Sequence, residues 1–178
     1  MTLVEIRLRE VRQMFHTLDP APFREKDLEE AAERYLVDAC REVGMRIPLK
    51  VVVYLPSDEA ESPAARSLPE AVHHYFHYRE RQVRADLLQL LRYGAASLAI
   101  GLMFLAACLL LRRVLLGHRP PLNGSFINEG LLILGWVAMW RPIEIFLYDW
   151  WPLTRRRALL RRLASVPLEI RAWPTAGP

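Results

Sequence analysis

The stretch from Phe126 to Trp151 is too apolar for a water-exposed surface, yet it carries Arg141 and Glu144. A helix of about 20 apolar residues spans the ~30 Å hydrocarbon core of a bilayer, so this stretch predicts a membrane span with charge inside it. An uncharged stretch from Tyr93 to Leu111 lies just upstream and predicts a first span. Together, the two stretches predict a transmembrane helical hairpin.

A chain of 178 residues with two spans has room for one small soluble domain. We therefore expect an α/β fold plus membrane: a two-span transmembrane helical hairpin with a small cytoplasmic α/β domain built from both termini. The expected segments are a β-α-β domain at 1–66, an amphipathic stalk helix at 67–92, transmembrane helix 1 at 93–116, a periplasmic turn at 117–125, transmembrane helix 2 at 126–151, and a basic helix with a last strand at 152–178.

Three segments have the residue patterns of strands. Leu3 to Val11 alternates between apolar and charged residues, as a half-buried strand does. Leu49 to Leu55 is apolar on both faces, which is typical of a central strand. Val166 to Trp173 predicts a last strand, which we expect to join the N-terminal sheet. The order strand, helix, strand near the N-terminus favours a parallel crossover.

Capping patterns predict where the soluble helices begin. Asp27 with Glu30 predicts the start of one helix, and Gly44 predicts its end. Ser67 with Glu70 predicts the start of the stalk helix, and no stop signal follows before the connection between the spans. The sequence therefore leaves open whether the stalk runs unbroken into the first span. Its apolar stripe must be covered by its own domain or by another subunit.

Basic residues concentrate beside the predicted spans. Residues 1–92 have a net charge of −2, whereas residues 93–178 have a net charge of +6. This asymmetry suits membrane lipids with anionic headgroups, and we expect no nucleic-acid partner. Nine arginines flank the outer ends of the hairpin against three in its connection, which predicts a bacterial inner (plasma) membrane protein with both termini cytoplasmic. Residues expected at the inner boundary are the lipid-binding and topology-setting Arg155, Arg156, Arg157, Arg161 and Arg162, and the interfacial anchors Trp136, Trp140, Tyr148, Trp150 and Trp151.

The charged residues of the second span are the first candidate site. Arg141 and Glu144 are three residues apart, so they can pair on one helical face and reduce the cost of charge in lipid. Either Arg141 lies inside the apolar region or the helix breaks at Pro142, where a kink is expected. The pair could serve an ion or proton path, or a polar contact between subunits. Alternatively, Arg141 reaches the inner headgroups and Pro142 begins an interfacial segment.

A cluster of histidines in the stalk is the second candidate site. His73, His74 and His77 include pairs spaced three and four residues apart, which can hold a metal ion or form a pH-sensing interface. No HExxH pattern accompanies them, and exposed histidines on a helix have the same spacing. We expect no cofactor and no catalytic residue. Cys40 and Cys108 do not form a disulfide framework.

The run GWVAMWRPIEIFLYDWWPLTRRR, from Gly135 to Arg157, with LDPAPF upstream, resembles a group of small uncharacterised bacterial membrane proteins with two spans. The resemblance implies the same two-span architecture. It implies no activity, cofactor or site residue.

These patterns favour a non-enzymatic inner-membrane protein that self-associates or acts as an accessory or assembly subunit of a membrane complex with other membrane-protein subunits. Its packing surfaces would be the stalk and the small residues of the first span. A second hypothesis is an oligomeric ion or proton channel, with Arg141 and Glu144 lining the path. A third is a His-dependent, membrane-tethered metalloprotein.

Overall fold

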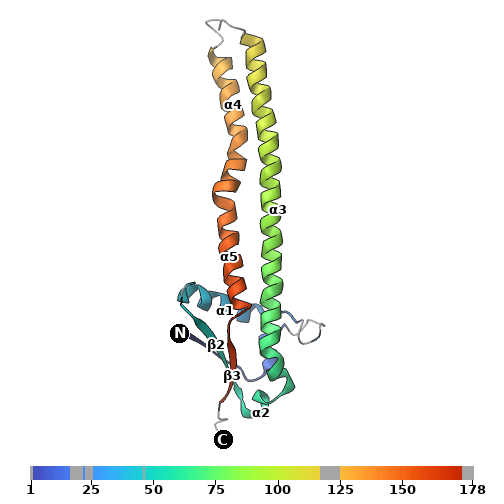
Figure 1. The fold of residues 1–178 in the computed structure, drawn as a ribbon, viewed down its shortest axis with the longest axis vertical. Coiled ribbons are helices and arrows are strands. Elements are labelled where there is room, and N and C mark those ends of the chain that lie inside the picture. Colours follow the sequence, from blue (N-terminus) through green and yellow to red (C-terminus); the bar gives the residue numbers. More distant parts are fainter. Residues whose placement is uncertain (1, 17–21, 23–25, 46, 117–124, 174–178) are drawn as a thin grey trace. The chain divides into compact units, whose positions relative to one another are not determined.

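The computed structural model describes residues 2–16, 22, 26–45, 47–116 and 125–173. The chain divides into two compact units, drawn in Figure 1. Unit 1 comprises residues 1–83 and 155–178, and unit 2 comprises residues 84–154. The chain is mostly helical, with two long apolar helices and one small sheet.

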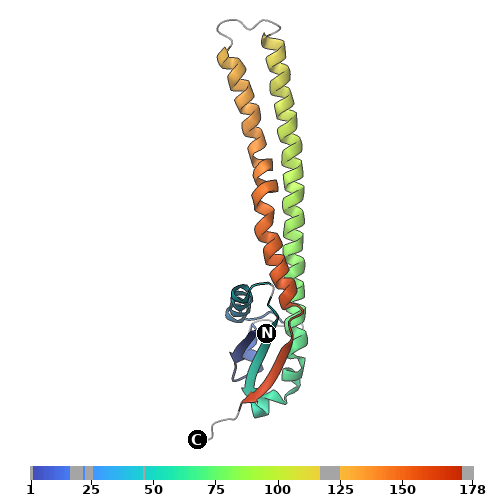
Figure 2. The ribbon, with the colours of Figure 1, turned by 60° about the vertical axis from the view of Figure 1, so that its left-hand side comes forward.

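Unit 1 contains a parallel sheet of three strands, β1 (Thr2–Arg7), β2 (Leu49–Pro56) and β3 (Leu168–Trp173). The strand order is β1-β2-β3, so the apolar β2 is central, as its sequence predicts. The C-terminal strand joins the N-terminal sheet, which confirms that both ends of the chain build one α/β unit (Figure 2). Val51 pairs with Val4 on one side and with Leu168 on the other.

The first strand is shorter than its alternating pattern predicts. β1 ends at Arg7, and the 3-10 helix η1 (Val11–Met14) follows. The side-chain oxygen of Gln13 accepts hydrogen bonds from the backbone of Arg9 and Glu10, which turns the chain away from the sheet. Val11 and Met14 are fully buried, so the apolar residues of this segment enter the core from a turn rather than from a strand.

Helix α1 (Glu30–Val43) begins without the capping box expected at Asp27 and Glu30. Its N-cap residue is Glu29, which makes no side-chain cap hydrogen bond. The reason is a bridge just before it: Leu28 pairs with Phe15, so the chain stays extended through this region. The predicted stop is confirmed, because Gly44 has φ 72°, a conformation that glycine adopts at little cost.

Helix α3 (Pro63–Leu116) begins earlier than predicted and is continuous. The short helix α2 (Ser57–Ala60) precedes it, and the Ser62 hydroxyl caps it by accepting a hydrogen bond from the backbone N–H of Ala65 at 3.0 Å. Ser67, the expected cap, instead donates to the carbonyl of Pro63 inside the helix. A single helix thus contains both the predicted stalk and the predicted first span.

The core of unit 1 is formed by one face of β2 and by three helices. Apolar side chains of α3 that the sequence assigns to the stalk stripe are buried there, which covers that part of the stripe within the chain. Helix α5 (Trp150–Leu163) contributes its C-terminal turns. The fully or nearly fully buried members are Leu36 and Cys40 from α1, Val51, Val53 and Leu55 from β2, Leu68, Val72 and Phe76 from α3, and Leu160 and Leu163 from α5.

Unit 2 consists of the second half of α3, helix α4 (Ser125–Glu144), the π-helical turn η3 (Ile145–Asp149) and the start of α5. The two helical segments pack against each other through glycines and run antiparallel. The close approaches are Gly94 to Ile145 and Phe146, Gly101 to Ala138 and Met139, and Gly135 to Leu105. Of the small residues of the first span, Gly94 and Gly101 therefore receive the chain's own second apolar helix, whereas Ala95, Ala106 and Ala107 are exposed. The predicted turn at 117–124 lies outside the described residues.

Helix α4 does not break at Pro142, which contradicts one of the two expectations for this position. The regular α-helix instead changes at Ile145, where five residues form the π-turn η3. Proline lacks an N–H, so the carbonyl of Ala138 loses its ordinary partner four residues on. Helical structure nevertheless continues from Ser125 to Leu163.

Candidate functional site

A cluster of three charged side chains lies in unit 2 at the end of α4. The Nη1 atom of Arg141 donates to Oε2 of Glu144 at 2.9 Å and lies 3.2 Å from Oδ2 of Asp149. The ion pair that the spacing of Arg141 and Glu144 predicts is therefore present. Asp149 joins it as a third member that the sequence did not predict.

The π-turn explains why Asp149 reaches Arg141. In a regular α-helix, a residue eight positions along points about 80° away from the first. A π-turn accommodates one extra residue. Asp149 therefore lies where the residue seven positions after Arg141 would lie in a regular α-helix, on the same face as Arg141. π-Turns inside α-helices are frequent at functional sites. No residue type in the sequence marks this turn, so the third member could not be anticipated from spacing.

The helix pairing places the cluster near one end of the uncharged stretch of α3. Arg141 lies between the level of Ala138, which meets Gly101, and the level of Ile145, which meets Gly94. Its guanidinium also pairs with Asp149, which lies nearer to the level at which the uncharged stretch of α3 begins. This direction agrees with the interpretation in which Arg141 reaches towards the boundary of the apolar region. The side chains of Arg141, Glu144 and Asp149 are nevertheless 51%, 43% and 31% exposed in the single chain.

Near this cluster, α3 and α4 approach each other closely at Gly101. A Cβ on Gly101 would lie 3.0 Å from the carbonyl oxygen of Ala138. This is the carbonyl that lacks its helical partner because Pro142 has no N–H. A side chain at position 101 would therefore crowd the backbone of α4, and glycine avoids this.

The aromatic residues predicted as anchors fall at two different levels. Trp136 and Trp140 are exposed and lie near the middle of the helix pair, beside the level of Gly101. Tyr148, Trp150 and Trp151 lie at and beyond the π-turn. The indole N–H of Trp150 donates to the carbonyl of Phe146 at 2.8 Å. Only this second group has the position expected of anchors at the end of an apolar stretch.

The five arginines of α5 lie in different surroundings. In unit 1, Arg157 pairs with Glu80 at 2.5 Å. Arg162 donates to the carbonyl of Gly44 at 2.6 Å and also to that of Ile47, which holds the turn after α1 against α5. Arg155, Arg156 and Arg161 are exposed. Arg157 and Arg162, two of the five arginines assigned to lipid or topology, therefore help to hold unit 1 together.

The histidines of α3 do not form a ligand set. The Nε2 atom of His73 lies 2.7 Å from the carbonyl oxygen of Val166, so this ring nitrogen donates to the C-terminal segment. His74 and His77 are exposed. Within the described ranges, no group of three or more His, Cys, Asp or Glu side chains could hold a metal ion.

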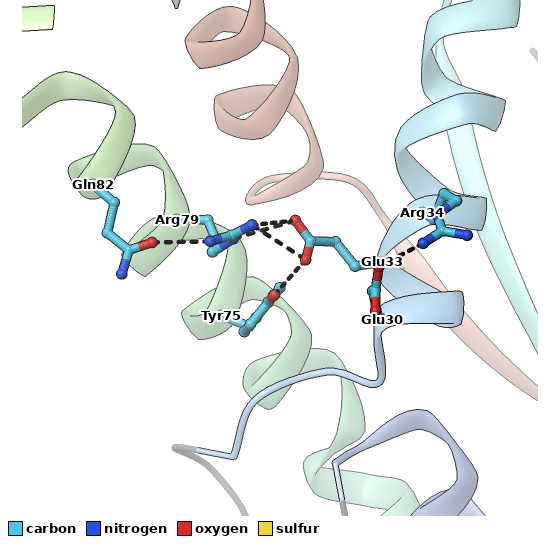
Figure 3. Close-up of polar contacts among 6 residues, drawn as sticks. All are labelled: Glu30, Glu33, Arg34, Tyr75, Arg79 and Gln82. Atoms are coloured by element: carbon cyan, nitrogen blue, oxygen red, sulfur yellow. Dashed lines mark hydrogen bonds and ion pairs between the residues drawn. The ribbon is translucent and has the colours of Figure 1, made fainter. Parts of the chain in front are cut away.

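A polar network links α1 to α3 in unit 1 and was not predicted from the sequence (Figure 3). The Tyr75 hydroxyl donates to Oε2 of Glu33 at 2.7 Å, and Arg79 donates to Oε1 of Glu33 at 3.0 Å. Arg79 also donates to Gln82 at 3.1 Å. Burial and the neighbouring Glu33 carboxylate raise the pKa of Tyr75 well above its usual value. This network joins α1 to the N-terminal part of α3.

A second polar group lies on the face of the sheet that carries Lys50, Val52 and Tyr54 of β2. Glu169 accepts hydrogen bonds from Arg171 at 2.9 Å and pairs with Lys50. These two donors hold the pKa of Glu169 at about 2, well below its ordinary value. Tyr54 donates to Glu5 at 3.2 Å on the same face. These polar side chains surround Val52, which pairs with Glu5 and Glu169 and is fully buried.

No protein-family model matches the chain, and neither a curated protein nor a solved structure matches it. The comparisons therefore transfer no family, activity or partner. What the chain does has to be inferred from its own residues and geometry.

Proposed function

We propose that this chain is a non-enzymatic integral membrane protein. Its two apolar helices would cross a bilayer as a hairpin and hold the α/β unit at the membrane surface within a membrane complex. That complex is either an oligomer of this chain or an assembly with other subunits, in which this chain serves as an accessory. The charge asymmetry of the sequence favours the inner membrane, with the α/β unit in the cytoplasm.

One observation carries this proposal: the helices of unit 2 bury Gly94, Gly101 and Gly135 between them and expose their large apolar residues. Both are long and apolar enough to cross a membrane. In each, only 17% of the most apolar stretch of 18 residues is buried. A core helix of a soluble protein would bury most of that surface. Leaving it in water costs about 25 cal/mol per Å² of apolar area, whereas lipid chains cover it at no such cost. Examples of this exposed surface are Ile100, Met103, Leu110, Val114 and Val137.

The antiparallel pairing supports a hairpin with both ends on one side. Gly94 meets Ile145 and Phe146, so the chain enters and leaves unit 2 at the same level. Arg92 and Asp149 lie close to that level, beside Trp150 and Trp151. Charged and aromatic side chains together are typical of the boundary between hydrocarbon and headgroups.

The experiment that tests this proposal is a gentle extraction of the protein from its own membranes. The mass of the extracted complex is measured, and every chain in it is identified. Resistance to an alkaline wash, followed by recovery in a complex larger than one chain, is the expected result. A protein released by the wash would contradict membrane integration, and a membrane-bound monomer would contradict an assembly role.

A second function is favoured by the half-exposed charges in α4. Arg141 and Glu144 from several copies could line a path for ions or protons. Purified protein in liposomes would then conduct, and Arg141→Gln or Glu144→Gln would change the flux. Flux no greater than that of empty liposomes rejects this function.

A further inference from the structure

Helix α4 carries two opposite packing seams, and only one of them is occupied. Gly135, Ala138 and the following π-turn face α3. On another face, residues recur at spacings of four, three and four, which is the spacing of helices that pack side by side. This outer seam consists of Ile133, Val137, Trp140 and Glu144. Val137 is 64% exposed and Trp140 is 71% exposed.

The charged cluster at the end of this seam is only half satisfied. Both contacts of Arg141 use the same nitrogen, Nη1. Within the described part of the chain, its Nη2 and Nε atoms have no acceptor, and Oε1 of Glu144 has no donor. The same exposed site therefore offers unused donors and unused acceptors.

Near the end of an apolar helix these groups need polar partners, which headgroups, water or another protein chain can supply. A second copy of the chain offers the matching set. Around a two-fold axis parallel to α4, which keeps both copies in the same orientation, Arg141 of one copy lies less than one helical turn along the axis from Glu144 of the other, and the reverse contact forms at the same time. The cluster is self-complementary in charge, which neither a lipid chain nor a uniformly apolar helix can be.

We propose that the outer seam of α4 binds a second copy of this chain, with each Arg141 donating to Glu144 of the other copy. The inference rests on the membrane location proposed above and names one partner within that complex. Val137 and Trp140 supply the apolar contact. Interhelical polar contacts of this kind contribute modestly in membranes, so the apolar seam and the two reciprocal ion pairs act together.

Cysteine cross-linking in native membranes tests this proposal. Cys40 and Cys108 are buried, so the wild-type chain gives the baseline. Val137→Cys should form a disulfide-linked dimer under mild oxidation. Ile100→Cys is the matched control, because Ile100 is 62% exposed but lies on α3. Cross-linking of both variants to the same extent, or of neither, overturns the proposal even when the protein stays in the membrane in a complex.

A mixing experiment separates contacts between copies from contacts within one. Two differently tagged chains, Arg141→Ala and Glu144→Ala, both with Val137→Cys, are expressed alone and together. Each alone lacks every Arg141–Glu144 contact, whereas the mixed dimer keeps one contact between copies. Random pairing of equal amounts of the two chains already gives twice as much mixed dimer as either variant dimer. We expect about tenfold more mixed dimer than random pairing gives, equivalent to about 1.4 kcal/mol. Mixed dimer at only the twofold excess of random pairing would show that the pair acts only within one chain and would overturn the proposal.

Discussion

The carbonyl oxygen of Ala138 lies 3.0 Å from the position that a Cβ on Gly101 would occupy. The contact is with backbone, which cannot rotate away as a side chain can. It also lies where Pro142 leaves a helical carbonyl without its donor. The close pairing of the two apolar helices at this level therefore depends on the absence of a side chain at Gly101.

Gly101→Val should weaken this pairing by about 1–3 kcal/mol, because the larger side chain forces the helices apart. Unfolding of the protein in mild detergent by added denaturing detergent, followed by tryptophan fluorescence, measures the change. Gly130→Ala is the control, since a Cβ there meets nothing within 4 Å and the stability should stay the same or rise slightly. Equal losses in both variants would mean that the close approach at Gly101 does not matter.

Arg141→Gln should destabilise unit 2 by roughly 1–2 kcal/mol, because Glu144 and Asp149 then face each other without a cation. The triple variant Arg141→Gln/Glu144→Gln/Asp149→Asn removes all three charges. It should be more stable than the single variant, because no unpaired carboxylate remains. The same denaturing-detergent titration compares the two. If the triple variant loses as much stability as the three single variants together, the three charges are not coupled.

Glu33→Gln should lower the free energy of unfolding of unit 1 by about 1–3 kcal/mol, since the charged acceptor shared by Tyr75 and Arg79 is lost. Figure 3 also provides the control, a pair one turn away between Glu30 and Arg34, both largely exposed. Glu30→Gln should change stability by less than about 1 kcal/mol. Thermal unfolding followed by circular dichroism of the purified protein distinguishes the two. Similar shifts for both variants would assign the Glu33 network no special role.

Glu169 should make the stability of unit 1 sensitive to acid. Its pKa is about 2 in the folded protein against an ordinary value of 4.5, because Arg171 and Lys50 donate to its carboxylate. The unfolded chain therefore binds the proton first, and the contribution of Glu169 is complete above pH 4.5 and disappears as the pH falls towards 2. Unfolding measured across this range should be less pH-dependent in Glu169→Gln than in the wild type. Identical pH dependence in the two proteins would contradict this account.

Most of the fold follows from short-range patterns. The apolar run of β2 marked the central strand, and Gly44 marked the end of α1. The lack of a stop signal after Ser67 permitted a continuous helix, and α3 is continuous. These features depend on residue type and spacing, which the sequence displays directly.

The starts of helices were less predictable. A serine cap and a downstream glutamate occur by chance, and Ser62 competes with Ser67 for the same helix. At α1, the bridge between Phe15 and Leu28 holds the chain extended past Asp27. Both outcomes depend on contacts that are distant in sequence, and these override local preference.

The candidate site was only partly predictable for a similar reason. The pairing of Arg141 with Glu144 follows from a spacing of three. Asp149 joins them because the π-turn shifts the phase of the helix, and no spacing rule includes that shift. The network around Glu33 joins α1 to α3, which are far apart in the sequence, so no local pattern of residues predicts it.

The central claim is that residues 93–149 form a membrane hairpin with both ends on one side. Trypsin treatment of sealed, inverted inner-membrane vesicles tests it most directly, with the fragments identified by mass. The account predicts cleavage at arginines outside the hairpin and a protected fragment in which Arg112, Arg113 and Arg119 stay intact until the vesicles are permeabilised. Cleavage at these three arginines in sealed vesicles, or release of the chain into the soluble fraction, would contradict it.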